Sequence, residues 1–328
     1  MSRRWPYRLR VMLLAVVLVG LAGTGWAGPV ERFPSREITL IVPWPAGGGS
    51  DIAMRLLAER ARVHFGVPVV VVNRPGAAGA IGHREIANAT PDGYTIGMFG
   101  SGFIAQQYMI PNPTLIDEIQ PLAFFGLDPG ALTVRGETPW RTLRDFVTAA
   151  KAAPNTIRNA NDPPGGGSHL TVLMIERRLG IHLIKVPYAG FAPSVVAMLG
   201  GETQSTTIPV PDVIEVHKAG KARILGVMGD ERHFLAPDVP TFKEQGFDVV
   251  YGTWRTLAAP KGIPSDRLTV LEEKLLTTLR DERFIDRARR AGFIVSPKSL
   301  RLTEAYLKAE DALIYSILLE LGLVRTPR

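Results

Sequence analysis

Two glycine-rich turns are the parts of this sequence whose residue types point most directly to chemistry. They span residues 45–51 (PAGGGSD) and 163–169 (PPGGGSH), and each lies between a strand-like run and a helix-like run. Glycine lets a ligand approach backbone N–H groups closely, and the first turn of a helix favours negative charge because the helix dipole is positive there. We therefore interpret both turns as candidate anion cradles, with an ordinary glycine-rich loop as the alternative for each.

The first turn supplies backbone contacts and one acidic side chain. Its candidate ligand contacts are Ala46, Gly47, Gly48, Gly49 and Asp51, and Trp44 before them is a candidate apolar wall. An acidic residue in this position commonly stabilises a helix N-terminus. The alternative is that Asp51 accepts a hydrogen bond from an amino or hydroxyl group of the ligand. Because Asp51 would repel a ligand carboxylate, that contact would need a bridging water or a cationic group.

The second turn and the ends of two other predicted strands add further candidates. Asn161, Gly167 and Ser168 offer hydrogen-bond donors to an anion, and Ser168 also fits the N-cap of the following helix. Ser101 follows another strand-like run and adds a hydroxyl group. Tyr188 follows a further predicted strand and adds a phenol hydroxyl group. The alternative is that Tyr188 is a half-buried aromatic residue of the core.

The residue types that enzymes need are present but are not arranged for catalysis. The six histidines are scattered, and none has a metal-ligand spacing to another histidine or a carboxylate. Ser50 adjoins Asp51 and Ser168 adjoins His169, but neighbours in sequence point apart, whereas a catalytic triad is assembled across space. No G-x-S-x-G nucleophile elbow occurs. We therefore predict a protein that is not an enzyme and uses no cofactor or metal.

The elements that must position these turns alternate between strand and helix. Short apolar runs at 38–42, 69–72 and 94–99 predict strands, and the stretches 50–65 and 81–89 between them predict helices. This β-α-β-α-β order predicts a parallel sheet with helices on its faces. Ligands of such sheets bind beyond the carboxyl ends of the strands, which is where the first turn lies.

The rest of the chain continues the alternation and then becomes helical. The predicted strands are 122–127, 131–134, 157–160, 182–186, 203–209, 224–228 and 254–258. The predicted helices are 142–153, 169–179, 193–199, 213–219, 268–279, 282–291 and 302–321. At 328 residues the chain exceeds what one core usually organises, so we expect an α/β protein of two domains with the helical tail packed back on an earlier core.

The N-terminus predicts export. Four arginines within residues 3–10 precede an apolar run at 11–22, and Gly25 and Ala27 fit a cleavage site, so residues 1–27 read as a signal peptide. The chain has no cysteine, which excludes a lipid anchor on cysteine and disulfides. Removing the four arginines of residues 1–27, which include no acidic residue, lowers the formal net charge from +7 to +3. This mild charge argues against a nucleic-acid partner, and we predict a periplasmic protein.

A series of motifs, in order along the chain, resembles the extracytoplasmic solute receptors of the tripartite tricarboxylate transporters, also called Bug proteins. The motifs are 41–51 (IVPWPAGGGSD), 72–79 (VNRPGAAG), 91–95 (PDGYT), 167–170 (GSHL), 186–190 (VPYAG), 199–201 (LGG), 237–241 (PDVPT) and 254–255 (WR). The resemblance implies a two-lobed periplasmic binding-protein fold of type II character, with a mainly parallel sheet in each lobe and the ligand cleft between them. On that basis we assign residues 28–130 and 253–328 to lobe 1 and residues 131–252 to lobe 2.

The resemblance also implies how a ligand is held. One ligand carboxylate would meet the backbone of residues 47–49, Ser168 with the loop before it, and Tyr188, while Ser101 matches a hydroxyl position. Phe191 departs from the family pattern, because a second small residue often follows Gly190, and it would narrow the pocket. A second departure, residues 203–205 (TQS), replaces the usual valine-aspartate pair.

The function that the resemblance implies is capture of a small mono-, di- or tricarboxylate and its delivery to a permease of one large and one small integral membrane protein. We expect a monomer. One alternative is a carboxylate-sensing subunit of a signalling system, which would use the same site. The other is an exported α/β hydrolase that uses Ser50 or Ser168 as its nucleophile.

Overall fold

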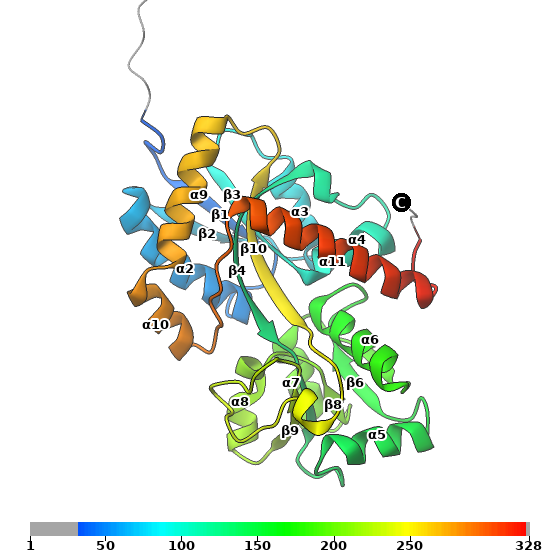
Figure 1. The fold of residues 1–328 in the computed structure, drawn as a ribbon. Coiled ribbons are helices and arrows are strands. Elements are labelled where there is room, and N and C mark those ends of the chain that lie inside the picture. The colour runs from blue at the N-terminus through cyan, green and yellow to red at the C-terminus, as the bar shows by residue number, and fades with distance from the viewer. Residues whose placement is uncertain (1–31, 326–328) are drawn as a thin grey trace, which may run out of the picture. The chain divides into compact units, whose positions relative to one another are not determined.

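The computed structural model describes residues 32–325, so the predicted signal peptide at 1–27 lies outside the described residues. Within the described part, two five-stranded sheets organise the chain (Figure 1). The first consists of β1 (Ile38–Val42), β2 (Val69–Asn73), β3 (Thr95–Gly100), β4 (Ile119–Pro129) and β10 (Gly252–Pro260), in the order β2-β1-β3-β10-β4. The second consists of β5 (Ala131–Arg135), β6 (Arg158–Asn161), β7 (Ile184–Pro187), β8 (Ser205–Thr206) and β9 (Ala222–Val227), in the order β7-β6-β8-β5-β9.

Both sheets are mixed and share one pattern of strand directions. In the first sheet β1 runs parallel to β2 and β3, whereas β10 runs antiparallel to β3 and β4. In the second sheet β6 runs parallel to β7 and β8, whereas β5 runs antiparallel to β8 and β9. The two-lobed α/β fold is confirmed, and four strands of each sheet run in one direction, with β10 and β5 as the reversed strands.

Helices follow the strands along the chain and contact the sheets. The described helices are α2 (Gly49–Phe65), α3 (Ala80–Ala87), α4 (Ser101–Met109), α5 (Leu143–Ala152), α6 (Gly167–Leu179), α7 (Phe191–Leu199), α8 (Val210–Lys218), α9 (Ser265–Leu279), α10 (Glu282–Arg290) and α11 (Leu300–Glu320). The C-terminal helices return to the first sheet, because α9 and α11 contact β4 while α9 and α10 contact α2. Within residues 32–325, no helix combines the length and the apolar character that crossing a membrane requires.

Helix α4 is the element that the sequence did not reveal. All nine of its residues are buried. A helix that is buried on every side lacks the alternation of apolar and polar faces by which a surface helix is recognised. No helix is therefore predicted from its sequence, SGFIAQQYM, although its N-terminus carries the predicted contact Ser101.

Two neighbouring stretches carry the chain between the sheets. β4 passes into β5 at Gly130, and the chain returns into β10 at Gly252, which pairs with Pro129. The Gly130 N–H donates to the carbonyl of Tyr251 over 3.0 Å, so the two crossings are joined. A Cβ on Gly252 would lie 2.2 Å from the Asp128 carbonyl oxygen, which requires glycine there. The paired crossings form a short connection suited to a hinge.

Candidate functional site

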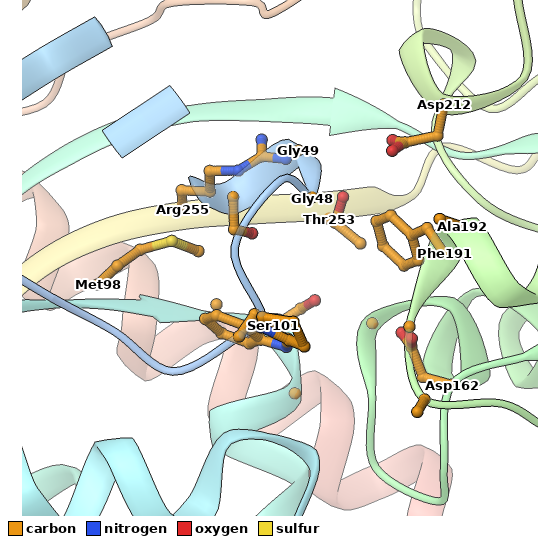
Figure 2. A pocket seen from close by; sticks show the side chains of 18 of the residues that line it. Gly48, Gly49, Met98, Ser101, Asp162, Phe191, Ala192, Asp212, Thr253 and Arg255 are labelled. Atoms are coloured by element: carbon orange, nitrogen blue, oxygen red, sulfur yellow. The ribbon is translucent and has the colours of Figure 1, made fainter. Parts of the chain in front are cut away.

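A cavity of about 440 Å³ lies between residues that belong to the two sheets and their helices (Figure 2). Its lining from the first sheet and the helices that follow it comprises Trp44, Pro45, Ala46, Gly47, Gly48, Gly49, Ser50, Met98, Gly100, Ser101, Gly102, Thr253, Trp254 and Arg255. Its lining from the second comprises Asp162, Gly167, Ala189, Gly190, Phe191, Ala192, Pro193 and Asp212. This volume suits a small organic molecule.

Helix N-termini converge on this cavity from both sides. The first residues of α2, α4, α6 and α7, namely Gly49, Ser101, Gly167 and Phe191, all line it. This convergence follows from topology, because each of these helices begins just beyond the carboxyl end of a strand. The unpaired N–H groups and the positive dipole ends of the helices make the cavity favourable for an anion.

Seven of the eleven sequence-predicted contacts line the cavity. They are Trp44, Ala46, Gly47, Gly48, Gly49, Ser101 and Gly167. The other four, Asp51, Asn161, Ser168 and Tyr188, are not among its lining residues. Their direct contact with a ligand stays a prediction, and the structure gives each of them a place behind or beside the cavity wall.

Asp51 lies behind the first turn and holds it in place. Its carboxylate accepts hydrogen bonds from the Gly47 N–H at 2.9 Å, the Arg55 guanidinium at 3.0 Å and the Asn73 amide at 2.9 Å. The Asn73 amide also donates to the Trp44 carbonyl at 3.0 Å. Burial pushes the pKa of Asp51 upward, but the hydrogen bonds from Arg55, Gly47 and Asn73 outweigh it and hold that pKa below its ordinary value. Asp51 is therefore an ionised carboxylate that positions the turn.

Ser168 supports the second turn in the same way, whereas Asn161 bonds within its own strand. The Ser168 hydroxyl, which is fully buried, accepts the Asp162 N–H at 2.7 Å, and the Ser168 N–H donates to Asp162 Oδ2 at 3.0 Å. The Asn161 amide donates to the Asn159 carbonyl at 3.0 Å. A fully buried hydroxyl engaged in this way is unable to attack a ligand, so the geometry opposes Ser168 as a nucleophile.

Tyr188 lies at the edge of the second half of the site. Its hydroxyl donates to Glu202 Oε2 at 3.1 Å, and burial followed by the neighbouring Glu202 raises the pKa of the phenol. The two residues after it, Ala189 and Gly190, line the cavity instead. Tyr188 is thus oriented toward Glu202 in this structure.

Four polar or charged lining residues were missed by the sequence reasoning about the site: Asp162, Asp212, Thr253 and Arg255. Asp162 directly precedes the second glycine-rich turn, and Arg255 belongs to the 254–255 motif. Their positions next to or within these motifs are the signal that could have identified them. Asp212 occupies the first turn of α8, where an acidic residue commonly stabilises the helix through its interaction with the helix dipole. No local pattern marks Thr253.

Arg255 is buried and electrically compensated. It is 2 % exposed, forms a short ion pair with Asp128, and its guanidinium carbon lies 5.1 Å from the Phe293 ring centroid. Asp128 also accepts the Ile294 N–H at 3.1 Å. The cavity wall that contains Arg255 therefore carries a cation whose charge is largely compensated by Asp128.

Gly49 separates Arg255 from Asp212. A Cβ on Gly49 would lie 3.5 Å from Asp212 Oδ1 and 3.7 Å from Arg255 Nη2. Burial raises the pKa of Asp212 to about 7; Arg255 lowers it in part, and Asp128 and Asp162 raise it further. Asp212 thus changes charge near neutral pH within the site.

The two halves approach closely at glycines. A Cβ on Gly102 would lie 2.8 Å from the Gly165 carbonyl oxygen, and a Cβ on Gly167 would lie 2.5 Å from Thr253 Cγ2 and 3.1 Å from Ser101 Oγ. A larger residue at either glycine would hold the two sides apart. Gly102, and Gly167 of the second turn, therefore serve close packing across the cavity.

A second cavity of about 860 Å³ shares part of this lining, including Trp44, Gly102, Asp162 and Gly167. It extends toward Pro75 and the end of the described chain near Arg325. Across residues 32–325, no group of three or more histidine, cysteine or acidic side chains is placed to hold a metal ion.

Comparison with known proteins places these features in a family. The family model described as "Tripartite tricarboxylate transporter family receptor" matches residues 53–314. The chain is 30% identical to protein BugT of Bordetella pertussis over 281 residues, which covers 84% of this chain and 86% of that protein. The structure of the periplasmic binding protein BugD matches with a TM-score of 0.81 at 29% identity, covering 89% of this chain and 99% of that one. A Rhodopseudomonas palustris protein solved with adipate matches with a TM-score of 0.82 at 25% identity, covering 89% and 99%. The chain therefore belongs to the tripartite tricarboxylate transporter family of receptors, which are solute-binding proteins and not enzymes.

Proposed function

We propose that this protein captures a small organic carboxylate in the 440 Å³ cavity and delivers it to a tripartite tricarboxylate-type membrane permease. The observation that carries the proposal is the convergence of four helix N-termini on one cavity, two from each half of the molecule. Membership of the receptor family and the adipate held by a relative of the same fold support it.

We infer that the ligand carboxylate lies against the N–H groups of Gly48 and Gly49, the hydroxyl of Ser101 and the N-terminus of α6 at Gly167. These groups line the cavity, and the exposed backbone of the first turn leaves room for ligand oxygens. Hydrogen bonds to a charged group contribute about 1.5–3 kcal/mol each, so three or four of them, less the ordering cost, suit roughly micromolar binding.

Closure of two lobes around the ligand would couple binding to delivery. Lobe 1 would comprise residues 28–130 and 253–328, lobe 2 residues 131–252, and the paired crossings at Gly130 and Gly252 would bend. Contacts to both lobes at once favour the closed state, whereas a ligand that touched one lobe would leave the equilibrium unchanged. In this proposal the protein is a monomer that its signal peptide directs to the periplasm. There a permease of one large and one small membrane subunit would receive the ligand.

Calorimetric titration of the mature protein with adipate, other di- and tricarboxylates, and uncharged diamides of the same length tests the proposal. Carboxylates should bind and diamides should not. The Ser101→Ala variant should bind about 10- to 100-fold more weakly, the equivalent of one hydrogen bond to a charged group. Ser316→Ala, which changes an exposed serine on α11, should bind like the wild type. Binding of diamides, or equal affinity of Ser101→Ala and the wild type, would contradict the proposed site.

Uptake by cells tests the delivery step. Deletion of the gene for this protein should abolish uptake of the bound carboxylate at micromolar concentration, and the wild-type gene should restore it. Normal uptake in the deletion strain would refute the transport role while leaving the binding result intact.

A further inference from the structure

The two walls of the cavity differ in charge. The wall from the first sheet presents the N-termini of α2 and α4, and the charge of its Arg255 is balanced by Asp128. The wall from the second sheet presents the N-termini of α6 and α7 and, unlike the first wall, two carboxyl groups, Asp162 and Asp212 (Figure 2). When ionised, these two groups give the lining an excess of negative charge that no cation among the described residues neutralises through an ion pair.

The hydrogen bonding of these two acids leaves acceptor atoms free. Asp162 uses Oδ2 to accept the Ser168 N–H, and no described residue donates to its Oδ1. Neither oxygen of Asp212 has a hydrogen bond or an ion pair with a described residue. Both acids are thus available as acceptors toward the cavity. Both residues are half-buried, so water reaches these oxygens in the empty cavity, and a ligand group that donates to them would replace that water.

An aromatic ring lies between the two acids. Phe191, the first residue of α7, lines the cavity, and Figure 2 shows its ring between the side chains of Asp212 and Asp162. An aromatic face attracts a cation, and two flanking carboxylates strengthen that attraction. This is the residue that stands where the family pattern favours a small one.

A further group in the lining lacks a partner and points independently to a ligand. Thr253 is 8 % exposed and lines the cavity, and its hydroxyl has no hydrogen-bond partner. Buried hydroxyl groups are normally satisfied, so a polar ligand atom is the partner that this position calls for. A ligand that reaches both Thr253 and the second wall must carry polar groups at more than one place.

We propose that the ligand carries an ammonium or similar cationic group beside its carboxylate, and that Asp162, Asp212 and Phe191 bind this cation. The inference rests on the proposed function and specifies its substrate class as amino carboxylates. The carboxylate takes the N-termini of α2, α4 and α6, as in the proposed function, and the cation takes the part of the second wall between the carboxyl groups of Asp162 and Asp212. A plain dicarboxylate would instead bring its second negative charge toward two acids.

Titrations with ligand pairs that differ by one amino group test this inference. Suitable pairs are glutamate with glutarate, 2-aminoadipate with adipate, and 4-aminobutyrate with butyrate. At about pH 8, where Asp212 is ionised, at least one amino carboxylate should bind ten-fold or more tightly than its partner. Asp212→Asn should weaken that amino carboxylate ten-fold or more and should make the plain carboxylate bind more tightly, because it removes a negative charge from the lining. Since Asp212 has no hydrogen-bond partner among the described residues, this variant should keep the wild-type melting temperature.

Glu215→Gln is the matched control, because Glu215 lies on the same helix and its side chain is 84 % exposed. It should not change either affinity. A matching Asp162→Asn variant should also weaken the amino carboxylate, but its bond to Ser168 makes the melting temperature a necessary second readout.

The pH dependence gives a second readout with opposite signs for the two ligand classes. The charged groups that face Asp212 are Arg255 from β10, Asp128 from β4 and Asp162 from the loop before α6. As the pH falls through about 7 and Asp212 takes up a proton, amino carboxylates should bind more weakly and plain dicarboxylates more tightly. Asp212→Asn should remove both trends.

Two outcomes separate this inference from the proposed function. Plain dicarboxylates that bind as tightly as their amino partners at about pH 8, or an Asp212→Asn variant with unchanged affinity for amino carboxylates, would overturn the inference and leave carboxylate capture standing. Failure of every carboxylate of both classes to bind would overturn the proposed function itself.

Discussion

His83 shows how a single buried side chain supports the site from behind. Its ring is fully buried, lies 5.6 Å from the Trp44 ring centroid and stacks on Phe99 at 4.9 Å. Nδ1 lies 3.1 Å from Oε1 of Gln106. Burial disfavours the imidazolium and lowers the pKa of His83 to about 4, with the Gln106 hydrogen bond opposing it in part. The residue is therefore a neutral support for a cavity wall.

This buried imidazole predicts a stability change with pH. Between about pH 6.5 and pH 4 the unfolded chain binds a proton at His83 that the folded protein does not, so stability falls as the pH falls. The full effect for His83 is up to about 3 kcal/mol. Urea unfolding at several pH values should show a smaller loss for His83→Gln than for the wild type. Some loss should remain, because burial also lowers the pKa of His169 to about 4. An unchanged slope in His83→Gln, with exposed His182→Gln as control, would contradict this account.

At the scale of elements, Asp281 joins the returning tail to the helix that carries the first turn. It caps α10 by accepting the Arg283 N–H at 3.0 Å and the Phe284 N–H at 3.3 Å. It also binds Arg60 at 2.5 Å and His64 at 3.0 Å, both on α2. The Arg60 hydrogen bond is the main reason that the pKa of Asp281 falls to about 2. The position of α2 therefore depends on a contact more than two hundred residues away in sequence.

Asp281→Asn isolates the ionic part of this contact, since asparagine is also a good helix N-cap. We expect it to lower the free energy of unfolding by about 1–2 kcal/mol at neutral pH. A depressed carboxyl pKa stabilises the fold above the unfolded value and loses that effect as the pH falls through the folded value. The difference between wild type and variant in denaturant midpoint should therefore shrink from about pH 4 toward pH 2. Asp286→Asn, on the exposed side of the same helix, should change little; a pH-independent difference for Asp281→Asn would refute the ionic explanation.

At the scale of the whole described chain, the fold allows the two sides of the site to meet because glycines face one another. Gly102 is the second residue of α4 and lies against Gly165 and Gly166 of the other half. The paired crossings at Gly130 and Gly252 connect the halves at a different place. Movement about these crossings would open or close the cavity without breaking either sheet.

Replacing Gly102 should prevent full closure. A Cβ there would meet the Gly165 carbonyl oxygen at 2.8 Å, so Gly102→Ala should wedge the halves slightly apart and Gly102→Val more so. We expect ligand affinity to fall about ten-fold or more in the valine variant, with a graded effect for alanine. Small-angle scattering should show that ligand compacts the wild type and no longer compacts the valine variant. Full compaction of Gly102→Val by ligand would rule out this glycine contact as part of closure.

Local sequence patterns predicted most of the helices and strands, because in most of them the buried apolar residues recur at the spacing of a helix or a strand. The strand predicted at 38–42 is β1, and the helix predicted at 50–65 is α2 to within one residue. The strand predicted at 203–209 is reduced to Ser205–Thr206. Helix α4 was missed because it is buried on all sides and has no periodic pattern.

The sequence by itself determined the glycine-rich turns, the order of strands and helices, and the resemblance to the receptor family, because each depends on residues close together in the chain. The tertiary structure decided which groups face the cavity. In the structure, Asp51 and Ser168 form hydrogen bonds that support the two turns and do not line the cavity. The lining instead includes Asp162, Asp212, Thr253 and Arg255. Those four come from three places in the chain, namely the loop after β6, the first turn of α8 and the first half of β10, and strand order in the two sheets decides that these places meet. No pattern within a single element contains that information.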